Sequence, residues 1–506
     1  MTVILCILPA IDWDRTYEEG TDVMTLKTIV LAVYALTIII VGLAGLRKTR
    51  SFSDYFLGGG KVGAWMTAFT YGTAYFSAVL FVGFAGKVGW GFGLSGLWIA
   101  LGNTLVGVFA VWWLLGPRIK RMSVEYGVHT IGEFLEKRYD SPFLKLFSSI
   151  CIFVFFIPYS AAVFIGLSYL FRSTFGIDYT LALILMGSFT ALYLVMGGYK
   201  SITIIDVIFG IIMLAGVGVL FVSILHNGNG LSNILDGISS INPKLTATVG
   251  PPGWWPLFSL VFLTSVAPMA MPQLLQKFYA IRDNRAIRIG MLGSTVFALL
   301  ITGIGYFAGA TTRYFLNPDI APMAFNNGTP VFDALMPELL TRIIPEALSI
   351  LMLLLILSAS MSTLAALVLI SSSAVAKDFY AGFVNHSVSD SGLTNLMRVM
   401  NAAIVILAVV LAFIRPATIV SILGISWGAI GAAFLGPFIW GLLTKKANRF
   451  GAIGSSLAGL AVCLILYATG TPSPQAGTLG MLTSIILTPI ISAVTPNTKK
   501  TNVSRA

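Results

Sequence analysis

The sequence predicts an all-α polytopic membrane protein with about 13 transmembrane helices. Of its 506 residues, 57% are hydrophobic and only 10% are charged, whereas a soluble globular protein carries about 25% charged residues. Runs of about 20 apolar residues recur along the whole chain, and this is the length that crosses roughly 30 Å of hydrocarbon as a helix. The sequence therefore favours a bundle of membrane-spanning helices without a separate soluble domain.

The apolar runs define the expected spans in order along the chain. By residue number they cover 26–46, 63–86, 91–116, 143–171, 179–197, 202–225, 256–280, 287–311, 347–375, 397–415, 417–443, 450–470 and 478–495.

The distribution of basic residues predicts the orientation of these spans. With the N-terminus outside, 23 of the 31 Lys and Arg residues fall on the inner side and 8 on the outer side. This is the bias that the positive-inside rule describes. We therefore expect a multi-pass protein of the cell (inner) membrane with a cytoplasmic C-terminal tail at 496–506. This excess of basic residues on the inner side of the lipid bilayer also explains the net charge of +11, so we expect no nucleic-acid partner.

The first 23 residues do not fit this pattern. Met1–Val23 is a short apolar start followed by a polar, acidic stretch. Two interpretations stay open. These residues are an outer N-terminal tail, or the start codon is wrongly assigned and translation begins at Met24.

The second span is expected to be a broken helix. Its middle, Thr70–Ser77, gathers hydroxyl groups around Gly72 at the depth of the bilayer midplane. Irregular backbone at that depth survives only where it lines a cavity or an ion site. A second interruption is expected at Ser265–Pro272, where two prolines lie four residues apart in an apolar stretch. Paired interruptions of this kind indicate a transporter binding site.

Six short motifs, each beside a particular span, carry a resemblance to a known family. They are Ser53–Gly60, Thr130–Tyr139, Gly197–Lys200, Pro272–Lys277, Ala359–Leu364 and Trp427–Pro437. In this order, on these sides of these spans, they resemble the sodium:solute symporter family, which includes proline, pantothenate and sugar transporters. The resemblance covers about residues 26–495.

The resemblance implies a leucine-transporter-type fold with a 5+5 inverted repeat. Residues 63–225 would form the first repeat and 256–443 the second, with discontinuous helices in spans 2 and 7. Residues 24–46 and 450–495 would be peripheral spans.

The function implied is sodium-coupled symport of a small organic solute into the cell by alternating access. The solute would be an amino acid, a carboxylate or a pantothenate-like compound. The alternatives are proton-coupled or uncoupled transport on the same fold, and a membrane sensor. No enzyme motif is present, so we expect no enzymatic activity and no cofactor besides Na⁺ as the coupling ion, with no other metal site. The sequence leaves the oligomeric state open.

The resemblance also implies a sodium site between the break in span 2 and span 9. The matching positions would supply backbone carbonyls and two hydroxyls, namely Thr73, Phe76, Ala359, Ser362 and Thr363. The alternative is that the hydroxyls bond carbonyls of their own helix, as Ser and Thr often do in membrane helices.

The candidate residues for a solute pocket lie in spans 2, 3 and 7. They are Tyr75, Ser77, Asn103, Thr104, Thr264, Met269 and Gln273. Tyr75 stands where the proline branch of the family has an aspartate, so the role of that carboxylate does not carry over. The sugar and proline patterns of span 7 are both absent, and the substrate therefore stays open.

Asp206 is the acid that lies well inside a predicted span. An intramembrane carboxylate is a functional candidate by default, and the family has an acid here that is linked to ion release. The alternative is a structural ion pair with Lys200 or an arginine at the inner surface.

Overall fold

The computed structural model describes residues 21–46 and 51–496. Most of the expected N-terminal tail and nearly all of the expected C-terminal tail therefore lie outside the described residues. The helices within the apolar runs before the second break, with the extension α7, are α2 (Thr21–Leu46), α4 (Ala64–Tyr75), α5 (Ala85–Phe92), α6 (Leu97–Gly102), α7 (Gly116–Tyr126), α9 (Pro142–Phe175), α10 (Tyr179–Met196), α11 (Tyr199–Asn227) and α13 (Trp254–Val266). Those after it are α14 (Pro272–Ala280), α15 (Asn284–Phe315), α17 (Glu346–Ser373), α18 (Asp390–Ile414), α19 (Ile419–Leu443), α20 (Arg449–Ala468) and α21 (Ser473–Val494).

Further elements join these helices. They are α3 (Phe52–Leu57), α8 (Ile131–Tyr139), α12 (Leu231–Ile241), α16 (Phe332–Ile343), the strands β1 (Phe325–Asn326) and β2 (Thr329–Pro330), and the π-helical segments Val79–Phe84, Asn103–Leu115 and Ala374–Val384. Four 3₁₀ turns complete the set, at Gly58–Gly60, Gly93–Gly96, Pro243–Leu245 and Pro322–Ala324, besides the one at the second break.

The helices account for all the expected apolar runs. Among the described residues, 11 helices are long and apolar enough to cross a membrane, or 12 if one bent pair is a single span. The run Val79–Tyr126 covers the second half of expected span 2 together with span 3. It turns at Gly93, whose φ of 60° is a conformation that favours glycine. The number of 13 spans stays a prediction.

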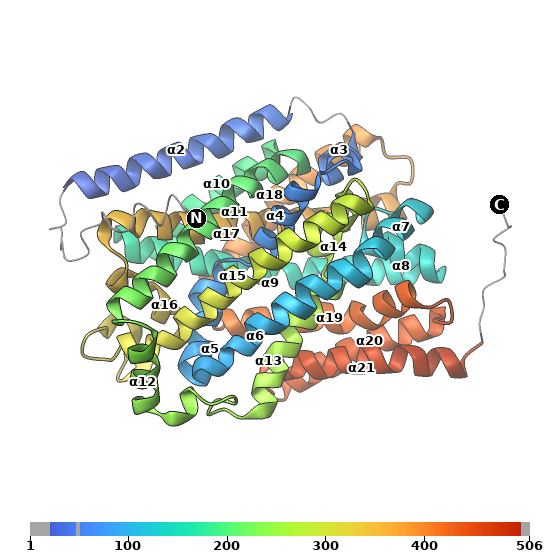
Figure 1. Cartoon of the computed structure of the whole chain (residues 1–506). Helices are drawn as coiled ribbons and strands as arrows, with labels where there is room; N and C mark the ends of the chain where they lie inside the picture. The colour runs from blue at the N-terminus through green and yellow to red at the C-terminus, as the bar shows by residue number, and fades with distance from the viewer. Residues whose placement is uncertain (1–20, 47–50, 497–506) are drawn as a thin grey trace.

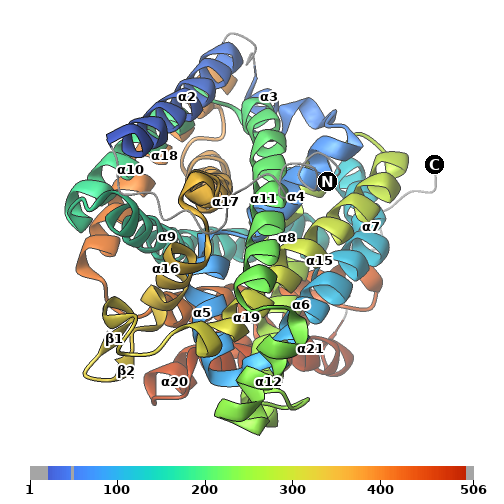
Figure 2. The same cartoon turned by 60° about the vertical axis from the view of Figure 1, so that its left-hand side comes forward.

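The centre of the bundle is formed by α17 and α19. The most apolar windows of these two spans are 94% and 89% buried, compared with 17% for α2. Helix α17 packs against α9, α11, α18 and α4, and Figure 2 shows it surrounded by neighbours. In Figure 1, α2 lies along one edge, and α20 and α21 lie together on the opposite side. These edge positions agree with peripheral spans, while the division into two repeats stays a prediction.

The structure contains both interruptions that the sequence predicts. Helix α4 ends at Tyr75, Phe76 is extended with φ −107° and ψ 102°, and the helical backbone resumes at Ala78. Helix α13 ends at Val266, a 3₁₀ turn covers Ala267–Ala270, and α14 begins at Pro272. The two halves of this second span meet at 41°.

Several of the sequence motifs meet at one end of the bundle. Arg138 of α8 donates to the carbonyl oxygens of Gly441 and Thr444 at 2.9 and 2.6 Å, where α19 ends. A guanidinium satisfies such terminal carbonyls well because they lack intrahelical partners. Similarly, the Gln276 amide donates to the Phe56 carbonyl oxygen at 2.8 Å. These motifs therefore fasten the loops between distant helices to one another.

Candidate functional site

The end of α4 faces two hydroxyl groups of α17. Ser362 Oγ donates to Thr73 Oγ1 at 2.8 Å. Thr363 Oγ1 lies 3.4 Å from the carbonyl oxygens of both Thr73 and Ala74. These carbonyls belong to the last turn of α4, where backbone acceptors are left over by the end of the helix. Neither hydroxyl bonds the carbonyl of its own helix, in contrast to Ser360, which donates to Ile356 at 2.6 Å.

We call this group of residues the cradle. It consists of the five positions expected to hold sodium, which are Thr73, Phe76, Ala359, Ser362 and Thr363. Every one of them is buried, with at most 3% of the side chain exposed. The structure thus brings the break in the second span next to the part of α17 that carries Ser362 and Thr363. The atoms that face one another there are hydroxyl and carbonyl oxygens.

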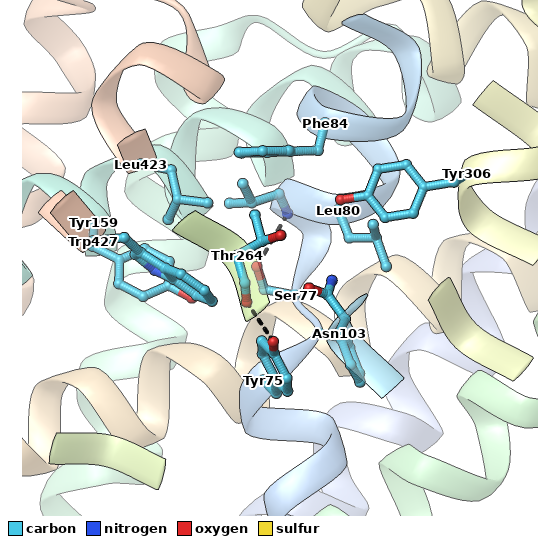
Figure 3. A pocket seen from close by; sticks show the side chains of 12 residues that line it. Tyr75, Ser77, Leu80, Phe84, Asn103, Tyr159, Thr264, Tyr306, Leu423 and Trp427 are labelled. Atoms are coloured by element: carbon cyan, nitrogen blue, oxygen red, sulfur yellow. Dashed lines mark hydrogen bonds between the residues drawn. The ribbon is translucent and has the colours of Figure 1, made fainter. Parts of the chain in front are cut away.

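A cavity lies beside the same break (Figure 3). It has about 340 Å³ of space between its lining atoms, part of which is open to solvent. Four of the expected pocket residues line it, namely Tyr75, Ser77, Asn103 and Thr264. The Tyr75 hydroxyl donates to the Thr264 carbonyl oxygen, so this tyrosine joins the two broken spans. Asn103 accepts a hydrogen bond from Ser265 Oγ at 3.1 Å.

The other expected pocket residues lie outside this lining. Thr104 and Gln273 are both buried, and their side-chain polar atoms have no hydrogen-bond partner among the described residues. Met269 lies half-buried in the turn of the second break. The structure therefore places these three side chains near the breaks but does not bring them into the cavity.

Aromatic side chains that the sequence analysis did not select complete the cavity. Tyr159 of α9, Tyr306 of α15 and Trp427 of α19 line it. The ring of Trp427 stacks 5.9 Å from Tyr75 and lies 6.0 Å from Tyr159. Trp427 belongs to the family motif Trp427–Pro437, to which the sequence assigned no pocket role. The two tyrosines lie in no motif, and their local sequence does not indicate a role in the cavity. None of the residues that line the cavity is charged.

Asp206 lies on α11 beside the cradle. Its side chain is 1% exposed, and neither carboxylate oxygen has a hydrogen-bond partner among the described residues. The neighbouring groups that act on this carboxylate are Lys277 of α14, Ser362 and Thr70. The basic group is thus Lys277, which is itself 1% exposed and whose Nζ lies 4.9 Å from the ring centre of Tyr199. Lys200, the partner considered from the sequence, is exposed.

Comparison with known proteins identifies the family of this chain. The model of the sodium:solute symporter family matches residues 55–459, which is most of the chain. The chain belongs to the sodium:solute symporter family. As a member of that family it is a sodium-coupled solute symporter, and sodium and a solute are the species that it transports.

Relatives of this symporter are similar over nearly their whole length. The osmoregulated proline transporter OpuE of Bacillus subtilis (strain 168) is 29% identical over 94% of this chain and 96% of its own. The high-affinity proline transporter PutP of the same organism is 30% identical over 85% and 90%.

Solved structures share the fold of this symporter. One of them is the substrate-bound outward-open state of a Na⁺-coupled sialic acid symporter, with a TM-score of 0.80. The match has 18% sequence identity and covers 94% of this chain and 98% of that chain. At this level of identity the similarity shows the fold alone.

Proposed function

We propose that this symporter carries a small amino acid such as proline into the cell together with sodium. The observation that supports this best is the uncharged aromatic cavity beside the break in the second span, directly next to the cradle. A solute and an ion held on the two sides of one break can stabilise each other. That arrangement would make the binding of each depend on the other.

The cradle suits a sodium ion that has lost its water. Thr363 Oγ1 lies 3.4 Å from the Thr73 and Ala74 carbonyl oxygens at the end of α4. Ser362 Oγ lies 2.8 Å from the Thr73 hydroxyl. The carboxyl end of a half-helix carries partial negative charge, which favours a cation. In this proposal Thr73, Phe76 and Ala359 give carbonyl oxygens, and Ser362 and Thr363 give hydroxyl oxygens.

The cavity suits a compact zwitterion. The buried Trp427 indole N–H and the neighbouring Tyr159 hydroxyl, which act on each other, would together meet a carboxylate. The helical segment after the break begins at Ala78, and its amino end also favours an anion. An ammonium group would be held by the aromatic rings that line the cavity, among them Tyr159 and Tyr306. Two relatives named as proline transporters support the same substrate class.

Alternating access would expose this cavity to the outside and then to the inside. The fold is arranged for it, since both broken spans meet at the cavity and Tyr75 bonds across them. The basic end of the bundle, where α7 and α8 lie, would face the cytoplasm. Asp206, next to the cradle and Lys277, would accept the ion as it leaves.

Flux measurements test this proposal. The purified protein is reconstituted in vesicles, and uptake of radiolabelled proline is measured with an inward gradient of sodium, of choline, or of protons at equal sodium. We expect accumulation only with the sodium gradient. Accumulation driven by the proton gradient, or equal uptake in choline, would contradict sodium coupling. If proline fails, competition by other amino acids and by pantothenate identifies the solute class.

A further inference from the structure

A second buried carboxylate lies at the inner end of α17. Asp378 is in the π-helical segment that continues α17 beyond Ser362, and its side chain is 1% exposed. Thr130 Oγ1 donates to Asp378 Oδ1 at 2.7 Å. Because Thr130 Oγ1 also accepts the Glu133 N–H at 3.0 Å, its own hydrogen atom points at the carboxylate. The other oxygen, Oδ2, has no hydrogen-bond partner among the described residues.

Two lysines lie near Asp378, but each is paired with another acid. Lys145 Nζ lies 3.0 Å from Glu136, and Lys377 Nζ lies 3.6 Å from Glu133. Burial alone would raise the pKa of Glu133, but its hydrogen bonds with His129 and the charge of Lys377 outweigh this and lower the pKa to about 2. Glu133 therefore keeps its charge and its lysine.

Asp378 is left without a base of its own. Within the described part of the chain, no Lys, Arg or His lies within 4.0 Å of its carboxylate. A buried carboxylate without a partner costs several kcal/mol unless a proton or a cation neutralises it. The group formed by Asp378, Glu133, Glu136, Lys145 and Lys377 thus has one more acid than it has lysines.

Oxygen-bearing side chains of a separate helix line a cavity at the same place. This small cavity is lined by Asp378, Thr130, Gln276, Tyr279 and His129, together with mostly apolar residues. The Gln276 Oε1 atom and the Tyr279 hydroxyl both belong to α14, are at least 96% buried, and have no hydrogen-bond partner among the described residues. A carboxylate, an amide oxygen and a phenol oxygen around a space too small for a solute form a donor set that hard cations prefer.

We propose that this cavity is a second cation site, in which Asp378, Gln276 and Tyr279 hold a sodium ion on the inner side of the cradle. The proposal rests on the proposed function insofar as sodium reaches the site through the transporter. The site lies between α14, the inner half of a broken span, and the inner end of α17. An ion that leaves the cradle inward would find there a buried carboxylate that no base among the described residues balances within 4.0 Å.

Equilibrium binding of radioactive sodium to the purified full-length protein tests the site. Choline replaces sodium to keep the ionic strength constant. The assay measures sodium binding alone and therefore needs no transported solute. We expect the wild type to bind about two sodium ions, and Asp378→Asn or the Ser362→Ala/Thr363→Ala pair to bind about one. The three changes together should abolish binding. Asp390→Asn, an acid-to-amide change at the same end of the bundle but outside this cavity, is the matched control and should bind like the wild type.

Thermal stability in choline separates a cation site from a structural role. If Asp378 is an unbalanced charge, Asp378→Asn should melt at a higher temperature than the wild type without sodium. It should also gain less stability when sodium is added. A lower melting temperature with full sodium stabilisation would show that Asp378 only accepts the Thr130 bond, and would overturn the site. So would a pH-dependent stability that vanishes in Asp378→Asn while sodium binding is unchanged, because the neutralising group would then be a proton.

Tyr279→Phe tests the site without disturbing the acid. The hydroxyl that it removes has no partner, so folding should be unaffected. The loss of one ligand should raise the sodium concentration for half-saturation of the inner site by about tenfold. If Tyr279→Phe and Asp378→Asn both bind sodium like the wild type while the cradle variants do not, the second site is wrong and the cradle stands. If only the cradle variants bind sodium like the wild type, the cradle assignment fails and the second site stands.

Discussion

The two breaks differ in how their backbone groups are satisfied. At the second break, a 3₁₀ turn and Pro272 close most of the chain locally, since Met271 donates to the Pro268 carbonyl and accepts from two N–H groups in the first turn of α14, while the Thr264 carbonyl accepts from Tyr75. At the first break, the last carbonyls of α4 meet side chains of α17, almost 300 residues away in sequence. A break that is closed within itself bends a helix, whereas a break completed by a distant helix can release its carbonyls to an ion.

Removing the hydroxyls of α17 should have the largest effect. Ser362→Ala or Thr363→Ala takes one oxygen from the proposed sodium shell, which costs about 1.5–3 kcal/mol. The apparent sodium affinity should therefore fall roughly ten- to a hundredfold, and affinity for solute at low sodium should fall with it. Uptake measured against sodium concentration gives both values.

Two variants sharpen this test. Thr363→Ser keeps the hydroxyl and should be milder than Thr363→Ala. Ser360→Ala removes a hydroxyl of the same helix that only bonds Ile356, so its sodium dependence should equal that of the wild type. If Ser362→Ala and Thr363→Ala reach the membrane with unchanged sodium dependence, the difference that we see between the breaks has no role in ion binding.

Changing the charge pair beside the first break should have the next largest effect. Asp206→Asn keeps the shape of the side chain and removes its charge, so ion release should slow and uptake should fall about tenfold. Lys277→Met alone leaves Asp206 as an unpaired buried charge and should destabilise the protein by about 3–5 kcal/mol. Adding Asp206→Asn to Lys277→Met should recover folding, as measured by melting temperature. Additive losses would mean that the two charges act separately.

Tyr75 tests the link between the two breaks. Tyr75→Phe loses the hydrogen bond to Thr264, worth about 0.5–1.5 kcal/mol, and should weaken solute affinity by up to about tenfold. Sodium dependence at saturating solute should not change. Tyr71→Phe is the control, because the Tyr71 hydroxyl bonds Gly107 and does not line the cavity. Equal losses of solute affinity in both variants would show that only packing matters here.

The smallest effect is expected at the second break. Pro268→Ala leaves the turn without a fixed φ, but its hydrogen bonds remain local. Stability should change by no more than about 1 kcal/mol, with unchanged sodium affinity. A large shift in sodium dependence would show that the second break also controls the ion, which would remove the distinction between the two.

Much of the fold could be predicted from the sequence because its causes are local. A span needs about 20 apolar residues, and the runs from Leu26 to Thr495 supply them in order. The second break follows from Pro268 and Pro272, and the first from the hydroxyls near Gly72. The facing of Ser362 and Thr363 toward α4 followed from the family resemblance, since spacing alone also allowed bonds within α17.

The rest was decided by tertiary structure. Which helix faces meet depends on the rotation and packing of helices that are far apart in the chain, and no local pattern encodes this. Tyr159, Tyr306 and Trp427 become one cavity only because α9, α15 and α19 converge. In the same way, sequence alone offered Lys200 or an arginine at the inner surface as a partner for Asp206, whereas folding brings Lys277 to it from the second broken span. A buried charge is matched by whichever group packing delivers, whatever the distance along the sequence.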